Sequence, residues 1–438
     1  MSTIEIQSHQ ASAYKGRTVR LKGYVHAVRN MGNLAFVIVR DANGTIQAVA
    51  DKPEVMKAAR ELTAESVVSI EGKVIEQPKS AQQVEISIEK LDLLAQPKDT
   101  LPVEISKISK VDGLALTTML DYRPLTLRSE KARAIFRIEA EFCAGFREFL
   151  GSQRFVEIHS PKIVSTGTEG GANLFVIDYF GKRAYLAQSP QFYKQIMVGV
   201  FERVLEIGPV YRAEQHDTTR HLNEYISMDL EMGFIDSEQD LIQMQTRLLS
   251  HMFARVQENC KRELELFSVT VPKFDAIPQL KLADAIELLR SQLGWAGEAG
   301  DLDPEAERLL CQHYQQETGC DLVYITHYPL EVRPFYAMPA PAQTDGVALS
   351  HSFDLLFRGL EVTTGGQRIH QYDQLTSAMT SRGLDPQQFT DYLQCFRYGM
   401  PPHGGLAIGL ERLAKQLLGL PTVKLASLFP RDINRLTP

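Results

Sequence analysis

The order of short β runs in the first 95 residues limits the possible folds more than any other feature. Three runs come first (18–28, 34–41 and 44–51), a helical stretch follows (53–63), and two more runs end the set (66–76 and 84–94). Asp41-Ala42-Asn43-Gly44 is a typical hairpin sequence between the second and third runs. Three strands, a helix and two strands is the order of a five-stranded barrel of the oligonucleotide-binding (OB) type. A different small β domain is the alternative.

Length and charge limit the class of protein. At about 100–200 residues per domain, a chain of 438 residues is expected to hold two or three domains. Hydrophobic residues make up 44% and charged residues 23%, which is ordinary for a globular protein. The net charge of −7 excludes a wholly basic nucleic-acid coat protein, but a local basic groove can still bind RNA.

The cysteines and the N-terminus indicate the compartment. The five cysteines form no C-x-x-C pair, so we expect reduced thiols in a cytoplasmic protein. His313 lies near Cys311 and Cys320, but this spacing matches no common zinc pattern. The N-terminus lacks a basic stretch followed by an apolar run, so we expect no secretory signal. No run of about 18 apolar residues predicts a membrane span.

The remaining sequence alternates β runs with helices. Residues 96–130, which contain Pro97, Pro102 and Pro124, are predicted to be a hinge, and a helix is predicted over about 130–150 with Ser129 as its N-cap. Residues 224–236 alternate as a strand does. Its expected apolar face comprises Ile226, Met228, Leu230, Met232 and Phe234, and its polar face Ser227, Asp229 and Glu231. Such a strand is typical of the floor of a polar site, and solvent exposure is the alternative.

Two segments carry arginines in patterns suited to anions. In residues 208–224, a strand ends at Arg212-Ala213-Glu214 and a polar loop leads to Arg220-His221. Arginines supply planar, always-charged donors for phosphate or carboxylate oxygens, although a surface hairpin with ion pairs is the alternative. In residues 401–420, Arg412 falls in the first turn of a helix that starts near Gly409. A cation at a helix start is unfavourable unless an anion compensates for it, which favours a bound phosphate. The sequence is not a P-loop.

Two further segments suggest a metal and an amino acid. Asp354 and Glu361 lie in an apolar strand, where a carboxylate needs a partner such as hydrated Mg²⁺ with a nucleotide polyphosphate. For Glu361, a structural arginine is the alternative. Gly365-Gly366 is expected to let the backbone approach a ligand. The flexible acidic stretch at 168–171 and the polar side chains at 188–194 suit a zwitterion such as an amino acid. Those polar side chains are Gln188, Gln191 and Lys194.

Together these segments resemble the three signature motifs of class II aminoacyl-tRNA synthetases. Phe155-Val156-Glu157 with Pro161 is similar to motif 1, which in that family builds the dimer interface. Residues 212–224 are similar to motif 2, and residues 409–412 (Gly-Leu-Glu-Arg) are similar to motif 3. Within class II, the chain most resembles aspartyl-tRNA synthetases of the short archaeal type, because it lacks room for the large inserted domain of the usual bacterial form.

The resemblance implies an α+β fold in three parts. An OB-fold anticodon-binding domain is expected at 1–100 and a hinge at 101–130. A class II catalytic domain is expected at 131–438, with a small insertion at about 271–345. Its sheet is expected to be mainly antiparallel and flanked by helices. The implied partners are L-aspartate, ATP, tRNA-Asp and a second copy of the chain in a homodimer, with no membrane partner.

The resemblance also assigns roles to individual residues. Arg212 is the expected catalytic residue, and Glu361 with Thr364 are the expected Mg²⁺ ligands, Thr364 standing where many relatives have Ser. The expected aspartate contacts are Glu169, Gln191, Lys194, Arg212, Thr364 and Arg368. The expected ATP contacts are Arg212, Glu214, Arg220, His221, Leu222, Glu361, Gly409 and Arg412. The expected anticodon contacts are His26, Phe36 and Gln47.

The amino acid and the tRNA are the finest predictions. Lys194 and Arg368 are two cations expected in one side-chain pocket, so a carboxamide would leave a buried charge unpaired; this favours aspartate over asparagine. Phe36 is expected to stack on a base, although it could simply be a core residue. His26 stands where tRNA-Asp-restricted enzymes tend to carry Trp, which slightly favours an enzyme that also charges tRNA-Asn. The position near Ala81 matches neither pattern.

The expected chemistry has two steps and needs no protein nucleophile. Aspartate and ATP give aspartyl-adenylate and pyrophosphate, and the terminal adenosine of tRNA then accepts the aspartyl group. Three alternatives stay open: an asparaginyl-tRNA synthetase, an asparagine-forming ligase on the same catalytic domain, and a tRNA-binding regulatory paralogue. The barrel disfavours the ligase. The paralogue predicts loss of the motif arginines, all of which are present.

Overall fold

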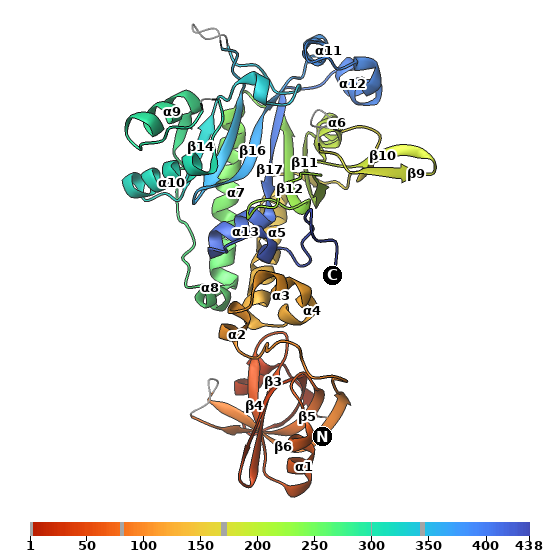
Figure 1. The fold of residues 1–438 in the computed structure, drawn as a ribbon, viewed down its shortest axis with the longest axis vertical. Coiled ribbons are helices and arrows are strands. Elements are labelled where there is room, and N and C mark those ends of the chain that lie inside the picture. Colours follow the sequence, from red (N-terminus) through yellow and green to blue (C-terminus); the bar gives the residue numbers. More distant parts are fainter. Residues whose placement is uncertain (1–2, 79–82, 168–172, 299, 342–346) are drawn as a thin grey trace. The chain divides into compact units, whose positions relative to one another are not determined.

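The computed structural model describes the chain apart from residues 1–2, 79–82, 168–172, 299 and 342–346. It divides into two compact units, Met1–Glu130 and Lys131–Pro438 (Figure 1). The first unit is built on a β-barrel, and the second on a large sheet with helices. No helix among the described residues has the length and apolar character that a membrane crossing needs.

The barrel of the first unit has five strands. They are β2 (Thr18–Met31), β3 (Leu34–Arg40), β4 (Thr45–Ala50), β5 (Val67–Glu76) and β6 (Val84–Ala95). The strand order is β2-β3-β4-β6-β5, and β5 pairs back to β2 to close the barrel. Helix α1 (Pro53–Glu61) connects β4 to β5, while β1 (Ile4–Glu5) and the 3₁₀ helix η1 (Ser8–Tyr14) precede β2. The predicted five-stranded barrel of the OB type is therefore confirmed.

Local chemistry explains the hairpin between β3 and β4. The Asp41 carboxylate accepts hydrogen bonds from the backbone amides of Asn43 (2.8 Å) and Gly44 (3.0 Å), as an Asx turn does. Val37 and Ile46 from the two strands then point into the barrel core. The segment that the sequence predicts as a hinge contains the short helices α2 (Ile108–Asp112), α3 (Leu116–Asp121) and α4 (Arg123–Thr126).

The second unit contains an eight-stranded sheet in the order β13-β14-β15-β16-β17-β12-β11-β7. All neighbours are antiparallel except β13 with β14 and β11 with β7, so the predicted mainly antiparallel sheet is confirmed. The strands are β7 (Val156–Glu157), β11 (Arg203–Tyr211), β12 (Glu224–Gly233), β13 (Gln279–Lys281), β14 (Leu322–Thr326), β15 (Ser352–Phe357), β16 (Leu360–Arg368) and β17 (His403–Gly409). A smaller sheet contains β8 (Ile163–Val164), β9 (Val176–Tyr179) and β10 (Lys182–Leu186).

The helices of the second unit include several that pack against the large sheet (Figure 1). They are α5 (Glu130–Ser152), α6 (Gln191–Phe201), α7 (Glu238–Asn259), α8 (Lys261–Phe267), α9 (Leu282–Ser291), α10 (Pro304–Thr318), α11 (Tyr372–Ser381), α12 (Thr390–Arg397) and α13 (Leu410–Leu418). The 3₁₀ helices are η2 (Leu330–Val332), η3 (Pro386–Phe389) and η4 (Val423–Ala426). One core joins α5, α7 and α13 to β12 and β17 through residues such as Phe142, Met252, Leu413, Leu230 and Leu406.

Strand β12 divides this apolar core from a polar site. Its apolar side chains Met228, Leu230 and Met232 are buried in the core. The side chains of the opposite face are buried as well, and they are Ser227, Asp229 and Glu231. The polar face is therefore not exposed to solvent, which favours the polar-site reading. Phe234 was expected on the apolar face, but this is wrong: the strand ends at Gly233, and Phe234 has φ +58° and is 70% exposed.

Candidate active site

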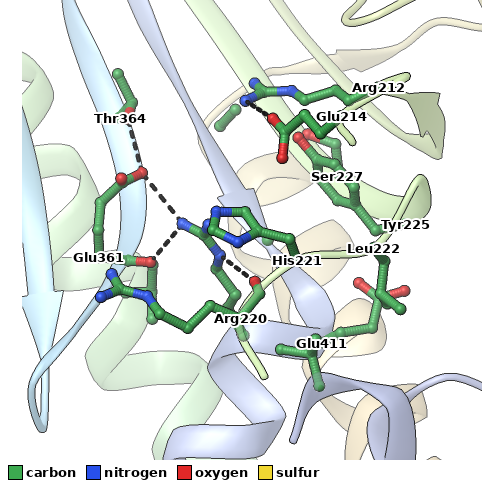
Figure 2. Close-up of a pocket in the computed structure, with 15 residues that line it drawn as sticks. Arg212, Glu214, Arg220, His221, Leu222, Tyr225, Ser227, Glu361, Thr364 and Glu411 are labelled. Atoms are coloured by element: carbon green, nitrogen blue, oxygen red, sulfur yellow. Dashed lines mark hydrogen bonds and ion pairs between the residues drawn. The ribbon is translucent and has the colours of Figure 1, made fainter. Parts of the chain in front are cut away.

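A cavity of about 230 Å³ brings motif 2 together with β16 and the start of α13 (Figure 2). Every residue predicted to contact ATP lines it. The lining residues are Arg212, Glu214, Arg220, His221, Leu222, Tyr225, Ser227, Glu361, Val362, Thr364, Ala407, Gly409, Glu411, Arg412 and Val423. The sequence analysis placed these residues in separate motifs, and the antiparallel pairing of β12, β17 and β16 brings the motifs to one face.

The loop that carries Arg212 is fixed by the side chain of Asn223. The Asn223 side-chain amide donates to the carbonyl oxygens of Arg212 (2.7 Å) and Glu214 (3.0 Å). Arg212 Nη1 lies 3.9 Å from a Glu214 oxygen, and its guanidinium lies 5.8 Å from the centre of the Tyr225 ring. Figure 2 shows Arg212 and Glu214 on one side of the cavity and Glu361 with Thr364 on the other. No sequence motif pointed to Asn223 as an organiser of this loop.

Glu361 and Thr364 form a pair of oxygen donors at the cavity wall. The Thr364 hydroxyl donates to Glu361 Oε1 at 3.0 Å, and Arg412 Nη1 lies 3.5 Å from the same oxygen. Burial acts to raise the pKa of Glu361, whereas the charge of Arg412 and then the hydrogen bond from Thr364 lower it. The lowering effects are larger together, so the pKa lies below its usual value. The arginine partner that we kept as the alternative is therefore present. The Glu361 side chain is still 34% exposed, and an ionised carboxylate beside a hydroxyl suits Mg²⁺.

Arg220 is held by a carboxylate that the sequence analysis missed. Its Nη2 donates to both oxygens of Glu307 of α10, at 2.7 and 2.5 Å, and Glu307 also accepts a hydrogen bond from the Glu361 amide at 3.1 Å. Burial raises the pKa of Glu307 to about 7. Beside it, burial and then Arg412 lower the pKa of His221. Glu307 lies in a stretch with weak sequence signals, so no motif pointed to it.

A buried network of four charges lies on the same face of the sheet. Lys194 Nζ of α6 lies 2.9 Å from Asp229 and 3.2 Å from Glu231, and Arg368 Nε lies 3.1 Å from Glu231. All four side chains are less than 10% exposed. The Gln191 amide lies beside them, with its nitrogen 3.5 Å from Glu231 and its oxygen 3.4 Å from Arg368. The structure thus brings Lys194, Arg368 and Gln191 together.

This pairing overturns one premise of the sequence analysis. We expected that a neutral substrate side chain would leave Lys194 or Arg368 as an unpaired buried cation. The structure contradicts this, because the polar face of β12 supplies Asp229 and Glu231 as permanent partners. Two cations face two carboxylates before any substrate is considered, so selectivity must be argued from the whole set of charges.

The glycines near these charges accommodate the protein itself. A Cβ on Gly405 would collide with the Glu231 carboxylate, so glycine is needed there. A Cβ on Gly365 would lie 2.5 Å from the Phe353 ring, and one on Gly366 would lie 2.8 Å from the His351 carbonyl oxygen. The expectation that Gly365-Gly366 lets a ligand approach is therefore wrong, because neighbouring protein atoms occupy that space.

Two other predicted acidic groups have different outcomes. Glu169, an expected aspartate contact, lies outside the described residues. Asp354 pairs with Arg333 Nη2 at 2.7 Å, a partner that the sequence analysis did not identify. Burial raises the pKa of Asp354 despite this arginine.

Glu411 of motif 3 accepts a hydrogen bond from the Ile226 amide at 3.0 Å, and burial raises its pKa to about 8.

The predicted anticodon contacts lie on the barrel. Phe36 alternates with the core residues Ala35 and Val37 of β3 and is half-buried on the opposite face, so it is not a member of the buried core. Gln47 of β4 pairs with Ile38 on the same outer face and donates to Glu85 at 2.8 Å. His26 lies where the pairing of β2 with β3 is irregular, between Val25 and Ala27, and burial lowers its pKa.

Comparisons with known proteins identify both parts of the chain. Residues 115–433 match the family model of class II tRNA synthetases (D, K and N), and residues 19–94 match the OB-fold nucleic acid binding domain. An aspartate–tRNA(Asp/Asn) ligase of Deinococcus radiodurans is 47% identical over 97% of both chains. An enzyme of the same name from Thermus thermophilus is 46% identical over 97% of this chain and 98% of that one.

A solved structure shares the whole fold. Asparaginyl-tRNA synthetase from Pyrococcus horikoshii, complexed with asparaginyl-adenylate, superposes with a TM-score of 0.90 at 31% identity and covers 98% of each chain. The family model spans more than half of the chain, and the pocket holds the arginines of motifs 2 and 3. The chain therefore belongs to the class II tRNA synthetases of the D, K and N group, and it carries an OB-fold nucleic acid binding domain.

Proposed function

We propose that this chain is an aspartate–tRNA ligase. It activates L-aspartate with ATP and transfers the aspartyl group to the 3′ end of tRNA. The observation that carries this proposal is the convergence of three motif arginines, Arg212, Arg220 and Arg412, on one cavity beside the buried Lys194–Arg368 network. The names of the 46–47% identical relatives support the choice of aspartate.

The first step transfers AMP to the substrate. An oxygen of the aspartate α-carboxylate attacks the α-phosphorus, the bond from that phosphorus to the β-bridging oxygen breaks, and pyrophosphate leaves. Arg212 stabilises the charge that develops on the α-phosphate, since a positioned cation acts most strongly on charge that forms in the transition state. Glu214, His221, Leu222 and Gly409 complete the nucleotide site, and Arg220 and Arg412 hold the β- and γ-phosphates.

The second step transfers the aspartyl group. A hydroxyl oxygen of the terminal adenosine attacks the carbonyl carbon of aspartyl-adenylate, the bond to the phosphate oxygen breaks, and AMP leaves as the hydroxyl proton departs. Both steps exchange one acyl or phosphoryl bond for another, so the chain needs to position and stabilise groups rather than supply a nucleophile.

Mg²⁺ fits the oxygen donors at Glu361 and Thr364. These two groups lie 3.0 Å apart, and Mg²⁺ typically takes one or two protein oxygens together with substrate phosphates. When bound, the ion neutralises phosphate charge. Glu361 and Thr364 would hold it, and Arg412, 3.5 Å from the Glu361 carboxylate, lowers the pKa of that group.

The selection of aspartate follows from the two buried cations. Lys194 and Arg368 lie within 3.2 Å of the carboxylates of Asp229 and Glu231, and by resemblance they hold the β-carboxylate of aspartate. The amide of asparagine offers these two cations no charge, so asparagine is bound less well. Gln191, and by resemblance Glu169, hold the ammonium group.

The second candidate is an asparaginyl-tRNA synthetase. The high structural similarity to the Pyrococcus horikoshii enzyme, which binds asparaginyl-adenylate, favours it. The lower sequence identity of that protein, 31% against 47%, favours aspartate. Exchange of labelled pyrophosphate into ATP with each amino acid alone distinguishes the two.

The barrel binds the anticodon of tRNA through its outer face. Phe36 offers a ring for base stacking and Gln47 an amide for a base edge. His26 at the irregular position of β2 supports charging of tRNA-Asn as well as tRNA-Asp, and both relatives carry tRNA(Asp/Asn) in their names. Separate charging of purified tRNA-Asp and tRNA-Asn transcripts with aspartate tests this. Charging of tRNA-Asp alone would show that the enzyme is restricted to tRNA-Asp.

The enzyme acts as a homodimer in the cytoplasm. Motif 1 ends in β7, the edge strand of the large sheet, where Val156 is 39% exposed, and an edge strand is a natural place for a second copy to pair. All five cysteines are free thiols, which suits a reducing compartment. Light scattering on the purified chain measures the dimer directly.

Substitution of Arg212 tests the activity itself. Arg212→Ala should lower aspartate-dependent ATP–pyrophosphate exchange by about 10²–10³-fold or more, with the fold intact by circular dichroism. Arg308→Ala is the matched control, because Arg308 is 52% exposed on α10 and lies 3.6 Å from Glu305. Near-normal exchange in Arg212→Ala would refute the assignment.

A further inference from the structure

A cluster of three potential metal ligands lies apart from the residues that line the nucleotide cavity. Glu238 is the first residue of α7, His327 directly follows β14, and His351 directly precedes β15. Among the described residues, they form the only group of three such side chains whose donor atoms all lie within 4.8 Å of one another. None of the three has a role in the proposed reaction.

Backbone hydrogen bonds fix the two histidines. The His327 amide donates to the Ser352 carbonyl oxygen at 2.9 Å, and the His351 amide donates to the Met338 carbonyl oxygen at the same distance. His327 has φ +60°, a left-handed conformation that is uncommon for a side chain with a Cβ. The two imidazole rings lie 5.9 Å apart. Three separate elements therefore direct their side chains to one place.

A second layer of contacts prepares one imidazole as a ligand. His327 Nδ1 lies 3.0 Å from the Thr326 hydroxyl, and that hydroxyl is placed to donate to the Leu280 carbonyl oxygen at 3.4 Å. The hydroxyl can then accept the Nδ1 proton, which leaves the lone pair of Nε2 available. Metal-binding histidines are oriented in this way by a partner on the other nitrogen.

The carboxylate is mostly buried and is held by one histidine. Glu238 Oε2 lies 2.7 Å from His351 Nδ1, and the Glu238 side chain is 6% exposed. Burial acts to raise the pKa of Glu238, but the hydrogen bond with His351 and the other contacts of the carboxylate together outweigh it, so the pKa lies below its usual value. Among the charges that act on His327, Glu238 favours a bound cation and Lys281 opposes one.

We propose that Glu238, His327 and His351 bind one divalent transition-metal ion, for which Zn²⁺ is the probe. Two imidazoles and one carboxylate form a donor set that zinc accepts, with a fourth position left for water. Mg²⁺ and Ca²⁺ prefer oxygen ligands, so they fit this set poorly. An ion pair between Glu238 and His351 accounts for two of the side chains, but it gives no reason for His327 to join them. The ion would tie the start of α7 to β14 and β15.

Competition with a chromophoric zinc chelator tests the site on the full chain. The protein is stripped of metal, desalted and titrated without Mg²⁺ or nucleotide. We expect one equivalent of Zn²⁺ that is lost in the double variant His327→Ala/His351→Gln. His313→Ala is the control, because His313 lies on α10, 3.7 Å from Glu317. All variants keep the five thiols, so equal binding by wild type and double variant would assign the metal elsewhere and overturn the proposal.

Two further measurements guard against indirect effects. Co²⁺ should give ligand-field absorption without a thiolate charge-transfer band, whereas a strong thiolate band would contradict the proposed ligands. Thr326→Val leaves all three ligands in place and should weaken Zn²⁺ binding by about 10–100-fold. If the double variant loses its circular dichroism signal, Thr326→Val and the Co²⁺ spectrum still decide the question, because both are measured on the intact ligand set.

Discussion

The two ends of the proposed active site, the nucleotide cavity and the buried network of Lys194 and Arg368 proposed to bind the amino acid, hold positive charge in different ways. At the nucleotide end the arginines are partly exposed: the Arg212 side chain is 41% exposed and that of Arg412 is 23% exposed. At the amino-acid end, Lys194 and Arg368 are 3% and 9% exposed, with carboxylates within 3.2 Å. Both ends therefore combine cations with carboxylates, but at the nucleotide end only the pair of Arg220 with Glu307 lies mostly away from water.

This difference separates two roles for a carboxylate. Near the surface, an ion pair contributes less than about 1 kcal/mol, so Glu361, whose side chain is 34% exposed, can give way to phosphates or to a metal. In the interior, breaking a pair leaves an uncompensated charge, so Asp229 and Glu231 stay with Lys194 and Arg368. We infer that the nucleotide end exchanges its anions during the reaction, while the amino-acid end keeps its own.

The largest effect should come from breaking the buried network. Glu231→Gln keeps the side-chain shape but removes the carboxylate that both Lys194 and Arg368 contact. We expect the free energy of unfolding to fall by about 3–5 kcal/mol, measured by urea denaturation. The control Glu141→Gln removes a more exposed pair with Arg255 and should cost less than about 1 kcal/mol. Equal losses in the two variants would contradict the comparison.

The nucleotide end should show the opposite balance of activity and stability. Arg412→Gln should lower ATP–pyrophosphate exchange by about 10²-fold, because Arg412 contacts Glu361 and faces the expected phosphates. Its free energy of unfolding should change by less than about 1 kcal/mol. A variant that loses stability as much as Glu231→Gln does would show that Arg412 is structural.

A third prediction concerns pH and the buried Glu411. Its pKa is raised by burial from 4.5 to about 8, so between these values the folded state keeps a proton that the unfolded state has released. The stability gained from protonated Glu411 is complete below about pH 4.5 and is lost as pH rises toward 8. As pH rises from 5 to 8, the free energy of unfolding of Glu411→Gln should therefore fall by on the order of 2 kcal/mol less than that of wild type. Parallel urea curves at three pH values measure this, and identical slopes would exclude it.

The smallest effect tests whether the nucleotide-end carboxylates can be displaced. If Glu307 occupies Arg220 only until phosphate arrives, Glu307→Gln should lower the KM for ATP by about 3–10-fold, the size of one typical hydrogen bond. The KM for aspartate should stay within about twofold. A higher KM for ATP would mean instead that Glu307 holds Arg220 in its working position.

Much of this arrangement could be predicted from the sequence because it is encoded locally. The alternation in β12 and the turn at Asp41 depend on neighbouring residues, and both appear in the structure. The motif residues also carried their own signal, since Arg412 in a first helical turn needs an anion. These features predicted the barrel and the polar strand, while the resemblance to class II synthetases supplied the antiparallel sheet and the residues that line the cavity.

What the sequence did not reveal depends on contacts between distant segments. Glu307 meets Arg220 across 87 positions, and Arg333 meets Asp354 from a stretch without regular periodicity. The pairing of Lys194 with Asp229 and Glu231 requires α6 to pack on β12. No local pattern shows such packing, so the sequence predicted the two cations without their carboxylate partners.

The most direct test of the central claim compares aspartate with asparagine in the same exchange reaction. Lys194 and Arg368 are proposed to hold the β-carboxylate, so wild-type protein should support exchange with aspartate at a kcat/KM at least about 10³-fold higher than with asparagine, since a site built for one polar group rejects an analogue that lacks it. Exchange with asparagine equal to or faster than with aspartate would contradict the account.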